Sequence, residues 1–114
     1  MDVEKHLRLT HAGAMKLIEA GVKKAVEMKK PQCIAVVDEG GNLLAFTRMD
    51  GGKVLSIESA IRKAQTAASG RGPTGGIQGE LEFRLAHATS GRLVNLKGGL
   101  PIIVDNVTIG GIGV

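Results

Sequence analysis

Aromatic side chains are almost absent from this sequence, which has no Trp, no Tyr and only two Phe residues, Phe46 and Phe83. Proteins that bind single-stranded nucleic acids stack the bases on aromatic side chains. Lys and Arg are also spread along the chain rather than gathered in one patch. The formal net charge of +4 therefore suits an anionic small molecule, and we expect no nucleic-acid partner.

Cysteine is nearly absent as well, because Cys33 is the only one. A single cysteine allows neither an intrachain disulfide nor a Cys-x-x-Cys metal site. Long hydrophobic runs are missing too, since no segment approaches the ~18 uninterrupted apolar residues of a membrane span. The first residues carry mixed charges, unlike a secretory signal. We expect a cytoplasmic protein with no membrane partner.

Two amphipathic helices are predicted in a chain whose 114 residues suit one domain. Thr10 offers an N-cap oxygen to a helix over 10–29, and Pro31 follows its end. A second helix over 53–69 carries a stripe rich in alanine that can lie close to a sheet. The side chains expected to be buried by the two helices are Ala14, Ile18, Ala25, Ile57, Ile61 and Ala64.

Apolar runs separated by turn residues predict the strands. Residues 33–48 spell a β-hairpin whose turn lies at 38–42, and a weak helical pattern covers 81–85. Three further strands are expected at 92–96, 101–104 and 107–114. Five strands and two to three helices, without regular alternation of strand and helix, indicate an α+β fold with a mainly antiparallel sheet.

Four blocks of this sequence together resemble the GlcG/HbpS-like family, the DUF336 group. They are AVVDEGGNLLAFTRMDG at 35–51, AIRKAQTAA at 60–68, GGLPI at 98–102 and IGGIGV at 109–114. The blocks occur in the family's order and cover most of the chain from residue 9 onward. The resemblance implies a profilin-like α/β/α sandwich with a five-stranded sheet, and assembly into homo-oligomers, as dimers or larger.

Members of that family differ in function, so the resemblance implies several roles. The first is binding of a small ligand, with haem or a related tetrapyrrole such as a corrinoid as the cofactor class. The alternative is a small-molecule lyase or hydrolase of aromatic or organic-acid degradation, with Lys63 or His11 as the acid–base group. A structural or regulatory subunit without a ligand is the third role.

Two departures from the family pattern affect these expectations. Relatives continue past the glycine-rich final strand into a last helix, whereas the printed sequence stops at Val114, so we expect a single domain over 1–114 that lacks this helix. Relatives also often place an aromatic residue where this chain has Ser69, just before the loop at 70–76. A loop without that anchor is expected to be looser.

The candidate ligand-binding residues are four cationic or titratable side chains and one hydroxyl. Lys63 and Thr66 lie on one flank of the second helix, in the block that resembles the family's Lys-Ala-x-Thr-Ala motif. Lys63, Arg48 and Arg71 are expected to pair with ligand carboxylates. The resemblance implies that Thr66 lies near the tetrapyrrole, and His11 is the best histidine candidate for an iron ligand. The same spacings also suit ordinary solvated surfaces.

Other motifs in the sequence carry less. The glycines of 70–75 match a dinucleotide-binding fingerprint, but a helix precedes them where that fingerprint needs a strand. A Ser59–Lys63 nucleophile pair has no third residue to orient it. The three histidines are scattered without metal-ligand spacing, so no metal site is predicted.

Overall fold

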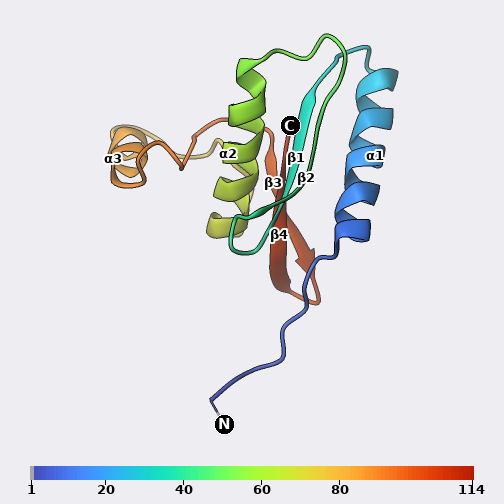
Figure 1. Ribbon diagram of the computed structural model, residues 1–114. Coiled ribbons are helices and arrows are strands. Elements are labelled where there is room, and N and C mark those ends of the chain that lie inside the picture. The colour runs from blue at the N-terminus through green and yellow to red at the C-terminus, as the bar shows by residue number, and fades with distance from the viewer. Residues whose placement is uncertain (1) are drawn as a thin grey trace.

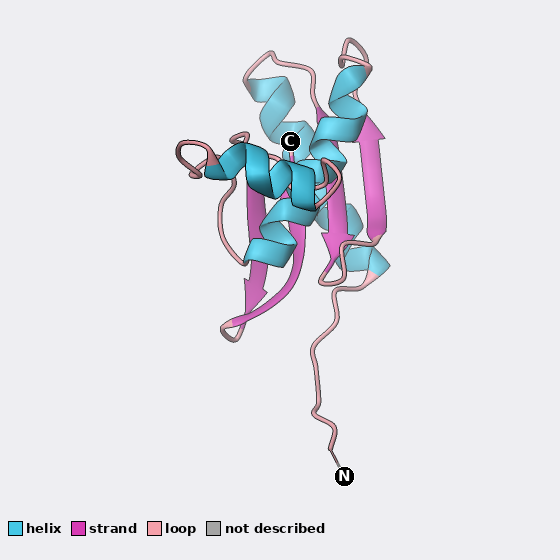
Figure 2. Ribbon diagram, turned by 90° about the vertical axis from the view of Figure 1, so that its left-hand side faces the viewer, coloured by secondary structure: helices cyan, strands magenta, loops and turns pink. Residues whose placement is uncertain are grey.

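A computed structural model describes residues 2–114 and arranges them in three layers (Figure 1). Helix α1 (His11–Glu27) covers one face of a four-stranded antiparallel sheet, and α2 (Leu55–Gly70) covers the other. The strands are β1 (Cys33–Asp38), β2 (Leu43–Arg48), β3 (Gly99–Val104) and β4 (Val107–Gly113), in the order β2-β1-β4-β3. The third helix, α3 (Leu81–Ala88), projects sideways from this body in Figure 1 and lies in front of it in Figure 2. The predicted α+β class with an antiparallel sheet is confirmed.

The first helix begins, and the hairpin turns, at the residues that the sequence predicted. Thr10 Oγ1 accepts a hydrogen bond of 3.0 Å from the backbone N–H of Gly13, which caps α1. The Asp38 carboxylate accepts from the backbone N–H groups of Gly40 and Asn42, each at 2.9 Å. These local bonds define the shape of the β1–β2 turn.

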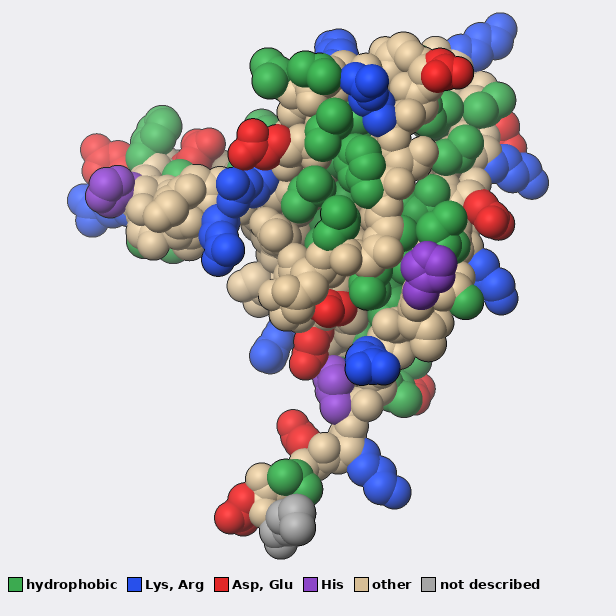
Figure 3. Space-filling view, viewed as in Figure 1, with side chains coloured by type: hydrophobic (Ala, Val, Ile, Leu, Met, Phe, Trp, Pro, Cys, Tyr) green, Lys and Arg blue, Asp and Glu red, His purple; other side chains and the backbone are tan. Residues whose placement is uncertain are grey.

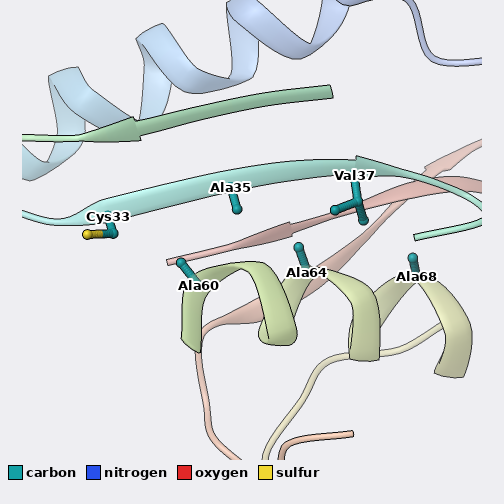
Figure 4. Packing of buried hydrophobic residues seen from close by; sticks show 6 residues of the cluster. All are labelled: Cys33, Ala35, Val37, Ala60, Ala64 and Ala68. Carbon is teal, nitrogen blue, oxygen red and sulfur yellow. The ribbon is translucent and has the colours of Figure 1, made fainter. Parts of the chain in front are cut away.

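The core has one part on each face of β1, whose residues from 33 to 37 are all buried. Small side chains of β1 face an alanine stripe on α2, as Figure 4 shows for Cys33, Ala35, Val37, Ala60, Ala64 and Ala68. The opposite face packs Ile34 and Val36 against Ala14 and Ile18 of α1. Ile57 and Ile61, expected to be buried, are only partly so, because they flank the alanine stripe rather than forming it.

Glycines in β4 allow α2 to lie directly on the sheet. A Cβ atom added at Gly111 would collide with the carbonyl oxygen of Ala64, and one at Gly113 would collide with that of Ala60. Backbone therefore packs against backbone over the middle of the sheet. This close approach fixes the position of α2 on the sheet.

The fifth strand, predicted over 92–96, is wrong, because this segment forms no ladder. The backbone N–H groups of Leu93 and Val94 donate instead to the hydroxyls of Thr89 and Thr66, each at 3.0 Å. Asn95 exchanges two side-chain hydrogen bonds with the backbone of Ile77. Side chains, one of them nearby in the sequence and one remote, thus satisfy backbone groups that a neighbouring strand would otherwise bind. The segment returns the chain from α3 to the body.

Candidate functional site

A cavity of about 1190 Å³, here called the α2 cavity, opens beside the C-terminal half of α2. Its walls come from the β1–β2 turn, the end of α2 with the loop at 70–77, the segment 88–94 that follows α3, and Thr108 of β4. Glycines, hydroxyls and amides form most of the lining, with Ile77, Leu93 and Val94 as the larger apolar contributions. The space exceeds the roughly 300–1,000 Å³ of ordinary small-molecule pockets.

Thr66 joins α2 to the chain segment on the far side of this cavity. Its hydroxyl donates to the carbonyl oxygen of Arg62 at 2.8 Å and accepts from the N–H of Val94 at 3.0 Å. The oxygen also lies 3.3 Å from the carbonyl of Arg92. Thr66 therefore ties α2 to the backbone of residues 92 and 94.

Two arginines give the α2 cavity its positive charge. Arg71 follows α2 in a left-handed conformation, with a φ of 57°, and its side chain is exposed. Arg92 lines the segment across the cavity and is also exposed. The one acidic lining residue, Glu39, contacts His6, with 2.7 Å between Oε2 and Nε2. Guanidinium groups pair with carboxylates in a fork geometry, so this arrangement favours an anionic ligand.

Gln65 supplies a further polar group to the cavity wall. Its side-chain Nε2 donates to the carbonyl of Gly41 at 3.1 Å, which ties α2 to the β1–β2 turn. Its Oε1 is buried and has no hydrogen-bond partner among residues 2–114. A buried acceptor without a donor costs about 1–3 kcal/mol. Gln65 therefore holds two walls of the cavity together at an energetic cost.

Lys63 lies next to a second, smaller cavity rather than in the wall of the first. Its ammonium group donates to the backbone carbonyl of Val114 at 3.0 Å. Val114 lines a space of about 500 Å³, and Pro73 and Thr74 line both this space and the α2 cavity. The two cavities thus meet at the loop after α2, with Arg71 on one side and Lys63 on the other.

The remaining sequence candidates lie elsewhere. Arg48 is paired with Cys33 at the end of the hairpin opposite the 38–42 turn, and His11 is exposed at the start of α1, on the other face of the sheet. Neither contributes to the α2 cavity. The Ser59 hydroxyl contacts the carbonyl of Ser56 at 3.5 Å, while Lys63 binds Val114, so the considered nucleophile pair is directed apart. The structure brings Thr66 and Arg71 together and leaves Arg48 and His11 outside.

Three residues of the site escaped the sequence analysis. Gln65 looks like any polar residue between alanines, and Arg92 opens a segment that was predicted to be a strand. Thr74 accepts from the N–H of Gly99 at 2.9 Å and so anchors the loop at 70–76 to the start of β3. Its place in a Gly- and Pro-rich loop, where a hydroxyl commonly satisfies backbone groups, was the available signal. The contacts of Gln65 and Arg92 are long-range, so the sequence holds no local signal for them.

No group of three or more His, Cys, Asp or Glu side chains among residues 2–114 is placed to hold a metal ion. No helix within these residues is both long and apolar enough to cross a membrane.

Known proteins resemble this chain in both sequence and structure. The family model described as "Haem degrading protein HbpS-like" matches residues 9–114. Protein GlcG of Escherichia coli K12 is 38% identical over 107 residues, which cover 93% of this chain and 80% of that protein. Klebsiella pneumoniae protein ORFY superposes with a TM-score of 0.90 at 31% identity, covering 99% of this chain and 82% of that one. PduOC, crystallised as a complex with haem, gives 0.81 at 25% identity, covering 94% and 81%.

Proposed function

The chain belongs to the HbpS-like family, and from that premise we propose that it binds a tetrapyrrole, haem in the first place, in the α2 cavity. The observation that carries the proposal is the pairing of a space of about 1190 Å³ with two arginines at its walls. The match to PduOC, whose crystal structure contains haem, supports the ligand class. The corrinoid adenosyltransferase PduO of Salmonella typhimurium, 28% identical over 103 residues, keeps a corrinoid as the second candidate.

Different lining residues would contact different parts of such a ligand. Ile77, Leu93 and Val94 give apolar contact to the macrocycle, and Arg71 and Arg92 pair with its carboxylates. Thr66 lines the same space, and its hydroxyl is a weak oxygen donor for iron. Bound haem would supply its own redox chemistry, while this chain positions it and neutralises its charge.

The contacts favour binding over catalysis by the residues first considered. Lys63 and His11, the acid–base candidates for a lyase or hydrolase, lie outside the α2 cavity. A general base must come within hydrogen-bond reach of the proton it removes. We place the protein in the cytoplasm, because its single cysteine, Cys33, is buried and free, as suits a reducing compartment.

Haem titration followed by absorption tests the proposal. Arg71→Ala should weaken binding by about 1.5–3 kcal/mol, the range for a hydrogen bond to a charged group. Lys63→Ala should have a smaller effect, since its ammonium group already binds Val114. The matched control is Lys16→Ala, an exposed cation on α1 across the sheet, for which no change is expected. Equal affinities for Arg71→Ala, Lys16→Ala and the native protein would contradict the proposed site.

A further inference from the structure

The helix α3 stands apart from the rest of the molecule. Within residues 2–114, none of the close packings between elements includes it, and none of its residues is buried. An isolated helix shorter than about 12–15 residues is marginal in water, and α3 has 8. Packing of side chains against another surface must therefore stabilise it.

Apolar side chains lie on two sides of α3. Leu81 and Leu85 are four residues apart and share one side of the helix, whereas Phe83 points to the opposite side. Phe83 is 71% exposed and Leu81 is 53% exposed. Helix α3 and the segments that join it to the body are here called the arm. Figure 3 shows hydrophobic side chains on both sides of this projecting arm. A helix that is apolar on opposite sides is usually enclosed rather than laid on a surface.

Charge identifies a surface of suitable character on the same chain. Glu82, in the first turn of α3, has no ion-pair partner among residues 2–114, whereas Glu80 lies 3.7 Å from Arg84 of the same helix. Arg71 and Arg92 carry positive charge on the walls of the α2 cavity. Helix α3 projects away from its own body (Figure 1), which leaves its side chains free to meet these arginines on a second molecule.

We infer that α3 of one molecule packs across the mouth of the α2 cavity of a second copy of this chain, with Phe83 as the main apolar contact. In a two-fold arrangement of the two copies, each arm meets the other copy's cavity, which makes both contacts at once and closes the dimer. The contact between copies is inferred from the exposed apolar side chains and the charge of α3. The effect of this contact on a bound ligand rests on the proposed function.

The same contact completes the proposed binding site. The walls of the α2 cavity are mostly glycine, hydroxyl and amide groups, whereas ligand sites are lined mainly by apolar and aromatic side chains. Phe83 of the second copy supplies the aromatic side chain that the cavity lacks. The site is then shared between two molecules, and the dimer binds ligand more tightly than a single chain.

Sedimentation equilibrium without ligand tests the contact between copies. The native protein should have twice the mass of one chain at micromolar concentration, and Phe83→Ser should raise the dissociation constant of the dimer roughly tenfold or more. Leu55→Ser is the matched control, because Leu55 is 81% exposed at the start of α2, far from the cavity at its other end. Monomeric native protein, or equal dimer affinity for Phe83→Ser and Leu55→Ser, would overturn the inference.

A charge exchange tests which surfaces meet. Arg92→Glu and Glu82→Arg should each weaken the dimer, and the double variant should recover most of the native affinity. Failure of the double variant to recover the native dimer affinity would show that the arm does not meet the cavity.

Haem titration of Phe83→Ser then separates the two proposals: weaker haem binding by the monomer supports a shared site, and unchanged haem binding removes Phe83 from it. Absence of haem binding by the native dimer would contradict the proposed function alone.

Discussion

Replacing Thr66 with Val should loosen the attachment of the arm to the body. The change keeps the side-chain shape but removes the hydroxyl that donates to the Arg62 carbonyl and accepts from the N–H of Val94. Each such bond contributes about 0.5–1.5 kcal/mol net, so the loss of both should lower the free energy of unfolding by about 1–3 kcal/mol. Urea denaturation measures this difference.

Amide hydrogen exchange tells whether the loss occurs at the arm. In Thr66→Val the N–H of Val94 has no acceptor and should exchange faster. The amides of β1 should lose only as much protection as the fall in global stability explains. Thr66→Ser is the control, since it keeps the hydroxyl and loses one methyl group, worth about 0.8 kcal/mol. Unchanged protection at Val94 in Thr66→Val would refute the view that Thr66 anchors the arm.

Three further predictions follow from the packing and charge of the site. Gly111→Ala should destabilise the protein by roughly 1–3 kcal/mol in a thermal melt, because its methyl group collides with the Ala64 carbonyl, whereas Gly76→Ala, with open space around it, should melt like the native protein. Asp38→Ala should cost about 1–2 kcal/mol through the lost turn bonds, and an unchanged melt would contradict this. Haem affinity should fall as salt rises, because exposed Arg71 is screened, and a salt-independent affinity would argue against ion pairing.

Local patterns predicted most of the fold because they are set by nearby residues. The cap at Thr10, the alanine stripe of α2 and the Asp38 turn are short-range features, and all three are present. The prediction of a strand at 92–96 was wrong because its apolar pattern is that of a strand, while its backbone partners include a side chain far away in the sequence, that of Thr66. A pattern of hydrophobic residues does not indicate which groups satisfy the backbone.

The site was predicted only in part for the same reason. Thr66 and Arg71 lie within two turns of one helix and its cap, so the sequence alone places them together. Arg92 joins them through the path of the arm, which no local signal describes. Arg48 and His11 were grouped with them on charge and chemistry, and the topology puts each at a different part of the molecule.

The central claim is that the tetrapyrrole occupies the α2 cavity, and NMR mapping of amide shifts tests it most directly. Zinc protoporphyrin IX, a diamagnetic analogue of haem, would be added to isotope-labelled protein. Binding in this cavity should give saturable shifts concentrated at 65–77 and 88–94, with the amides around His11 and Arg48 unaffected. Shifts centred on α1 or on the start of β1, or no saturable change at all, would contradict it.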